Sequence, residues 1–158
     1  MFPVMSFWPA CEPSGVLISN GLSTMGFALP AAIGAALLDR SRPTVTFTGD
    51  GGLMMCLGEL RTAARENLPL RIIVFDDGEL SLIRIKQVQR GYRTDGVSIG
   101  AIDWQSVGAG FGVLARQAAS EAALRDCLRE TAAHPGPVLI AASIDAGTYR
   151  ETIRALRG

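Results

Sequence analysis

The sequence predicts an α/β fold: a doubly wound, mostly parallel sheet with helices on both faces. Candidate strands and candidate helices alternate along the chain, which is the order of βα units. The candidate strands are continuous apolar runs, as in parallel strands that are buried on both faces. Of the 158 residues, 48% are hydrophobic and only 19% are charged, which suits a sheet covered on both sides or a large dry interface.

Five short apolar runs are the candidate strands. The two clearest are rich in β-branched and aromatic residues and lead directly into turns of glycine and aspartate. Another ends at Ser19-Asn20-Gly21, which is also a turn signal. The candidates are residues 16–18, 44–48, 70–75, 113–114 and 137–142.

Two helices are predicted before the third candidate strand. Residues 27–38 are apolar nearly all round, so we expect a buried helix with Pro30 in its first turn. A second helix is expected from about Leu53 to Glu66, because Asn67 and Pro69 follow as stop signals.

The remaining helical segments are less regular. Asp103 and Ser120 are candidate N-caps of two helices, the second of which should run to about residue 133. Residues 148–158 predict a terminal helix. The polar stretch 79–93 is compatible with a helix, a loop or a lid.

Charge and composition exclude several functions. Fifteen acidic and fifteen basic side chains cancel, so we expect no binding to nucleic acid or to a membrane surface. Cys11, Cys56 and Cys127 form no CxxC pair, which indicates small buried hydrophobes in a reducing cytoplasm. The single histidine, His134, is expected at a helix end. Residues 1–10 are too short to span a bilayer and are unlike a signal peptide, and we expect them to lie inside a longer polypeptide.

Two acidic clusters follow consecutive candidate strands. They are Gly49-Asp50-Gly51-Gly52 and Asp76-Asp77-Gly78. Consecutive parallel strands joined by one helix are expected to be neighbours about 5 Å apart, and ligands collect beyond their carboxyl ends. Two carboxylates this close repel, and a Mg²⁺ ion with phosphate ligands would relieve the repulsion.

The glycines of the first cluster favour a phosphate group beside the metal. Gly49, Gly51 and Gly52 have no Cβ, so the backbone can turn sharply and bring its amides against an anion. Either cluster alone is compatible with an ordinary β-turn. Both together, at consecutive strand ends, favour a metal and diphosphate site.

These residues resemble the thiamine-diphosphate motif, which opens with Gly-Asp-Gly and closes with a pair of asparagines; here Asp77 follows Asp50 by 27 residues. Residues 19–35 look like the stretch before that motif in the acetolactate synthase and decarboxylase branch of the family. Residues 59–69 are similar to the helix between its two halves. The resemblance covers nearly the whole chain, and it implies a single diphosphate-binding domain over residues 1–158 with the thiamine-diphosphate-binding fold.

The resemblance also implies how the cofactor, thiamine diphosphate with Mg²⁺, would be held. Asp50 and Asp77 would give side-chain oxygens to the metal, and Glu79 its backbone carbonyl. The amides of Gly51 and Gly52 would meet the diphosphate.

Two residues upstream would contact the rest of the cofactor. Met25 would wedge beneath the thiazolium ring, and the carbonyl of Ser23 would accept a hydrogen bond from the 4′-amino group. Ser23 stands where related chains carry glycine, which we expect to matter little because only the carbonyl is used. Asp77, and often Asp76, replace asparagine, so the site carries additional negative charge beside the diphosphate.

The family's activating glutamate belongs to a separate pyrimidine-binding domain that this chain does not resemble. We therefore expect no catalytic residue here, and a partner domain of the same enzyme or a partner subunit, in a homo-oligomer. The simplest account is a C-terminal fragment of a larger enzyme, and a naturally split enzyme is the second. Arg84, Lys86 and Arg90 could meet a substrate carboxylate or form a solvated helix face, so they are given no role.

Three functional hypotheses follow. The first is an enzyme domain for decarboxylation or carboligation of a small 2-oxo acid, a lyase or transferase similar to acetolactate synthase. The second is a non-catalytic cofactor-binding or regulatory module. The third is a flavodoxin-like nucleotide or phosphate binder, which would need no Mg²⁺ and would not explain the residues around Met25.

Overall fold

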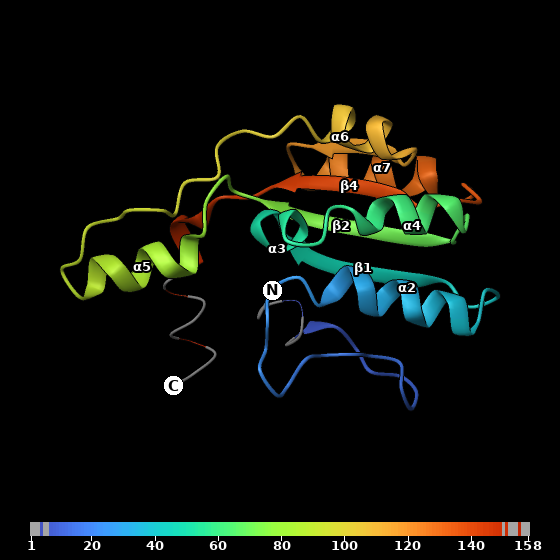
Figure 1. Cartoon of the computed structure of the whole chain (residues 1–158), viewed down its shortest axis with the longest axis horizontal. Helices are drawn as coiled ribbons and strands as arrows, with labels where there is room; N and C mark the ends of the chain where they lie inside the picture. Colours follow the sequence, from blue (N-terminus) through green and yellow to red (C-terminus); the bar gives the residue numbers. More distant parts are fainter. Residues whose placement is uncertain (1–3, 5–6, 150, 152–154, 156–158) are drawn as a thin grey trace.

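The sheet is parallel throughout the part of the chain that the computed structural model describes, which is residues 4, 7–149, 151 and 155. Its strand order is β1-β2-β4-β3 (Figure 1). The strands are β1 (Thr44–Gly49), β2 (Leu70–Asp76), β3 (Leu114–Ala118) and β4 (Val138–Ser143). This confirms the predicted α/β class and the candidate strands 44–48, 70–75 and 137–142, whereas β3 begins at the end of the candidate 113–114 and continues past it.

The register places the carboxyl ends of the strands at one edge. Gly49 of β1 is opposite Phe75 of β2, and Phe75 is opposite Ala142 of β4. The residues that follow β1 and β2 therefore begin side by side, which is the placement that the sequence predicts for the two acidic clusters.

Helices cover both faces of the sheet, because strand side chains alternate between two cores. Ile72 faces a large core that includes α2 (Ala28–Leu38), α4 (Glu59–Arg65) and α6 (Trp104–Phe111). Ile73 faces the opposite way, into a smaller core against which α7 packs. Helix α7 (Glu121–Thr131) begins at Ser120, and α6 begins at Asp103; both caps accept backbone hydrogen bonds, as predicted.

The helix expected over residues 53–66 is two shorter helices. Helix α3 (Asp50–Met54) begins at the first acidic residue and α4 begins at Glu59. Between them the N–H of Cys56 donates to Leu53, and that of Glu59 to Cys56. These bonds span three residues instead of four, so the chain tightens and changes direction. Asp50 is therefore a helical residue and not part of a loop.

Two further expectations differ from the structure. Residues 16–18 are not a strand: they have no regular secondary structure, and β1 is the edge strand of the described sheet. The chain after β4 turns into a short 3₁₀ helix, η1 (Ala146–Thr148), and most of the expected terminal helix lies outside the described residues.

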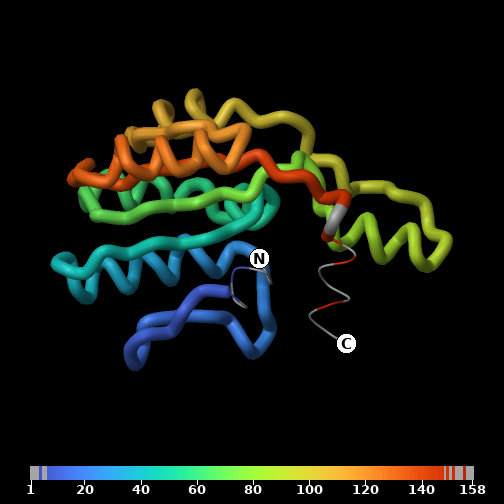
Figure 2. Tube along the Cα trace, turned by 180° about the vertical axis from the view of Figure 1, so that it is seen from behind, coloured from blue at the N-terminus to red at the C-terminus, as the bar shows by residue number. Residues whose placement is uncertain are grey.

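The polar stretch after β2 contains helix α5 (Ser81–Gln89). It projects beyond the carboxyl ends of the strands, next to the chain that leaves β4 (Figures 1 and 2). No helix among the described residues is long and apolar enough to cross a membrane. His134 follows α7 as predicted, but Cys11 is exposed and Cys56 and Cys127 are only partly buried, so the expectation of buried cysteines is wrong for Cys11.

Candidate functional site

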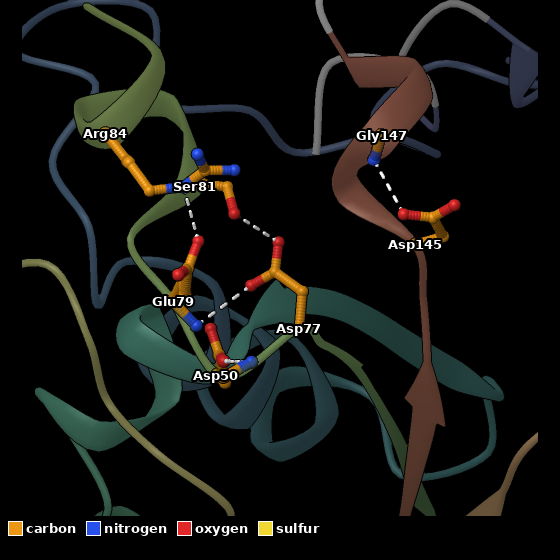
Figure 3. A network of polar contacts seen from close by, with 8 residues as sticks. Asp50, Asp77, Glu79, Ser81, Arg84, Asp145 and Gly147 are labelled. Carbon is orange, nitrogen blue, oxygen red and sulfur yellow. Dashed lines mark hydrogen bonds and ion pairs between the residues drawn. The ribbon is translucent and has the colours of Figure 1, made fainter. Parts of the chain in front are cut away.

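Asp50 lies where the ends of β1 and β2 meet. Its side chain is buried, with 4% exposed, because α3 begins directly at the end of β1. Oδ2 accepts a hydrogen bond from the backbone N–H of Gly78 at 2.9 Å, and Oδ1 accepts one from Gly51 at 2.6 Å. The structure thus joins the two acidic clusters, and Figure 3 shows Asp50 next to the turn that carries Asp77.

The electrostatics of this end of the sheet disfavour an ionised Asp50. Burial raises the pKa of the Asp50 carboxyl, and the negative charges of Asp77 and Asp76 raise it further. None of the ion pairs among the described residues involves Asp50 or Asp77. A divalent cation would favour the ionised form of both carboxylates, so the residues present fit a Mg²⁺ ion.

Asp77 sits in a turn whose geometry is fixed by several hydrogen bonds. Its Oδ1 accepts the N–H of Glu79 at 3.2 Å, and its Oδ2 accepts the hydroxyl of Ser81 at 2.6 Å. Gly78 has φ of +69°, which favours glycine, and its carbonyl accepts the N–H groups of residues 99–100. The carboxylate is therefore held in one orientation.

The Glu79 side chain is directed toward α5. Arg84 Nε donates to Glu79 Oε2 at 2.6 Å (Figure 3). The described residues contain no group of three His, Cys, Asp or Glu side chains placed to hold a metal. A metal here would thus take two carboxylates and complete its shell with backbone and ligand oxygens, which is how Mg²⁺ is commonly bound.

Two glycines allow close packing beneath the acidic residues. A Cβ on Gly51 would lie 2.4 Å from Leu80 Cδ2 and 3.2 Å from Met25 Cε, and one on Gly52 would lie 2.8 Å from Thr48 Oγ1. Met25 therefore lies against the start of α3, and the residue is 43% exposed. The N–H of Gly51, which we expect to meet a diphosphate, donates to Asp50 Oδ1 at 2.6 Å, so it would exchange this partner for the diphosphate on binding.

Ser23 adopts a left-handed backbone conformation with φ of +51°. Glycine reaches this conformation without strain, whereas another residue pays roughly 1 kcal/mol. The expectation that serine matters little concerned only its carbonyl, whereas the backbone conformation at this position favours glycine. Its hydroxyl donates to the carbonyl of Ser19 at 2.9 Å, which helps to hold the turn.

Three contributors to the site were not predicted. Trp104 is fully buried, and its indole N–H donates to Asp76 Oδ2 at 2.8 Å, so Asp76 is tied to α6. Ser81 bonds to Asp77, a contact that the Asp-x-x-x-Ser spacing could have suggested. Tyr149 lies close enough for the charge of Asp77 to raise its pKa, after the larger effect of burial. No sequence signal indicated Trp104 or Tyr149, because both contacts are tertiary.

Comparison with known proteins gives one matching family. The profile of the family described as thiamine pyrophosphate enzyme, C-terminal TPP binding domain, matches residues 2–142. The chain is 40% identical over 143 residues to the acetolactate synthase isozyme 1 large subunit of Escherichia coli, covering 88% of this chain and 25% of that protein. It is 35% identical over 139 residues to the acetolactate synthase of Bacillus subtilis, with 88% and 24% covered. The chain thus spans about a quarter of the length of these relatives.

A solved structure has the same fold. The thiamine diphosphate-dependent 4-hydroxybenzoylformate decarboxylase of Rhodococcus jostii RHA1 superposes with a TM-score of 0.70 and 27% sequence identity. The match covers 77% of this chain and 24% of that one. The similarity therefore extends from sequence to tertiary structure.

Proposed function

This chain belongs to the thiamine pyrophosphate enzymes, as the C-terminal TPP-binding domain of that family, and we propose that Asp50 and Asp77 hold its cofactor through a Mg²⁺ ion. Thiamine diphosphate is the cofactor that the family binds. The observation that carries the proposal is a buried carboxylate, Asp50, with a second carboxylate beside it and a pKa raised by burial and by that neighbour.

Each proposed ligand follows from its position. Asp50 and Asp77 give carboxylate oxygens from adjacent strand ends, and Glu79 gives its backbone carbonyl while its side chain pairs with Arg84. The amides of Gly51 and Gly52 and the backbone of Gly49 lie at the start of α3, where we propose that the diphosphate is bound.

Met25 and Ser23 are proposed to contact the organic part of the cofactor. Met25 packs against Gly51, so its half-exposed side chain can support a ring from below. The strained turn at Ser23 orients its carbonyl, which we propose as the acceptor for the 4′-amino group.

The reaction proposed for the whole protein is decarboxylation or carboligation of a small 2-oxo acid, as the names of the relatives suggest. Bound thiamine diphosphate supplies an electron sink for the reacting carbon. We propose that this chain binds and orients the cofactor in the cytoplasm, within a homo-oligomer. A pyrimidine-binding domain or subunit would supply the activating glutamate, and this chain would supply no catalytic side chain.

The test is calorimetric titration with thiamine diphosphate, with and without Mg²⁺, of the full protein together with any partner that carries the pyrimidine-binding domain. We expect binding that requires the metal and is lost in Asp50→Ala, and turnover of a 2-oxo acid. Binding without turnover would instead favour a non-catalytic cofactor-binding module. Metal-independent binding, unchanged in Asp50→Ala, would contradict the proposed ligands.

A further inference from the structure

We propose that Ser81 is a positioning residue for the metal site: its hydroxyl fixes the carboxylate of Asp77 in the orientation that binds Mg²⁺. The inference rests on the proposed function, because it needs Asp77 to be a metal ligand. It adds the first turn of α5 to the site, although Ser81 itself touches neither metal nor cofactor.

The contact between the two side chains is short and partly buried. Ser81 Oγ donates to Asp77 Oδ2 at 2.6 Å, and Ser81 is 7% exposed. A terminal carboxylate torsion is broad, so an isolated aspartate would sample many orientations. The hydroxyl of Ser81 and the N–H of Glu79 each donate to a different oxygen of Asp77, and together they select one orientation.

The carboxylate keeps capacity for a metal in this orientation. Two carboxylate oxygens offer about four lone-pair sites, and the hydrogen bonds from Glu79 and Ser81 occupy one on each oxygen. Protein groups that hydrogen-bond to a ligating carboxylate orient it in this way, and their removal commonly weakens metal binding.

Tertiary contacts fix Ser81 itself. The N–H of Leu80 donates to the carbonyl of Val97 at 2.7 Å, and the N–H of Ile99 donates to that of Gly78 at 2.8 Å. The turn is therefore held at both Gly78 and Leu80 by hydrogen bonds with the segment 97–99. Since Asp50 also bonds to Gly78, the positions of Asp50, Asp77 and Ser81 are tied to the same turn.

A purely structural role at the helix start is the competing explanation, and a second serine in this chain provides the matched control. Ser106 Oγ donates to Asp103 Oδ2, also at 2.6 Å, in the first turn of α6. That carboxylate caps the helix through the N–H groups of residues 105–106. Ser106→Ala thus removes the same type of hydrogen bond from a helix start whose capping carboxylate is not a proposed metal ligand.

The experiment measures Mg²⁺ affinity by calorimetry on the full protein at saturating thiamine diphosphate, well below the melting temperature of each variant. We expect Ser81→Ala to weaken Mg²⁺ binding about 10- to 100-fold, while Ser106→Ala leaves it unchanged. Ser81→Thr keeps the hydroxyl and should restore most of the affinity. If Ser81→Ala does not fold, Ser81→Cys, which keeps the volume but donates weakly, replaces it in the comparison with Ser81→Thr.

Two results would overturn the inference: Mg²⁺ affinity within twofold of the unsubstituted protein in Ser81→Ala or its replacement, or an equal loss in Ser106→Ala. Both results can be distinguished from failure of the proposed function. If the proposed function failed, the unsubstituted protein would bind thiamine diphosphate without metal, and Asp77→Ala would bind it equally well.

Discussion

The carboxylate of Asp50 accepts the backbone N–H of Gly78 at 2.9 Å, across 28 residues of sequence. This hydrogen bond joins the end of β1 to the turn after β2, at the edge of the sheet where both strands end. It also gives the buried carboxylate of Asp50 a hydrogen-bond partner. Four predictions follow from this site and from the packing that supports it.

The first prediction concerns pH. Because burial raises the pKa of Asp50 in the folded, metal-free protein, folding is penalised once this carboxyl ionises. The penalty is complete above the raised pKa and disappears as pH falls through it toward the ordinary value of 3.8. Urea unfolding in chelator should therefore show this pH dependence in the unsubstituted protein but not in Asp50→Asn. Added Mg²⁺ with thiamine diphosphate should remove the penalty, and parallel pH profiles of the two proteins in chelator would contradict the prediction.

The second prediction concerns Gly51. In Gly51→Ala the new Cβ would lie 2.4 Å from Leu80 Cδ2, so we expect a loss of about 1–3 kcal/mol in the free energy of unfolding. Met25, 3.2 Å from the same Cβ, should shift as well. Denaturant unfolding gives the stability, and cofactor titration should show weaker binding.

Gly34→Ala is the control for Gly51→Ala. Gly34 is exposed inside α2, and nothing lies within 4 Å of its added Cβ. We expect this substitution to stabilise the protein by about 0.5–1 kcal/mol. If both substitutions changed the free energy of unfolding equally, packing against Leu80 would not be the cause of the loss in Gly51→Ala.

The third prediction concerns Trp104 and Asp76. Trp104→Phe leaves the carboxylate of Asp76 without its indole donor and opens a small space in the core, so a loss of about 1–3 kcal/mol is expected. Asp76→Asn keeps an acceptor oxygen and should cost less. In the double variant the losses should not add, because both changes affect one hydrogen bond. Additive losses in a double-mutant cycle would mean that the two residues act independently.

The fourth prediction concerns Arg71, whose guanidinium closes the end of α7. It donates to the carbonyls of Ala132, His134 and Gly136 at 2.7–3.1 Å. A lysine ammonium cannot reproduce this forked geometry, so Arg71→Lys should lower the free energy of unfolding by about 1–3 kcal/mol.

Arg125→Lys serves as the control for Arg71. Arg125 pairs with Glu121 on the exposed face of α7, and exposed pairs contribute little, so a change within about 0.5 kcal/mol is expected. Thermal and urea unfolding of both variants give the comparison. A loss in Arg125→Lys as large as in Arg71→Lys would indicate that the forked contacts of Arg71 with the three carbonyls are not what stabilises this end of the helix.

The secondary structure was predictable where the local pattern was strong. The apolar runs that became β1, β2 and β4, and the caps Asp103 and Ser120, were recognisable because each depends on neighbouring residues. Residues 16–18 were predicted wrongly because a strand needs a partner that its own sequence does not reveal. The break between α3 and α4 was missed because helical propensity says little about a local tightening of the turns.

The sequence by itself determined that Asp50 and Asp77 follow consecutive parallel strands, and hence that two carboxylates meet at one edge of the sheet. Only the tertiary structure decided how they are held: Asp50 by Gly78, Asp77 by Ser81, and Asp76 turned away to Trp104. The physical reason is the distance along the chain over which each kind of interaction acts. Hydrophobic periodicity and turn residues act over a few positions, whereas burial and the choice of hydrogen-bond partner depend on segments that the fold brings together.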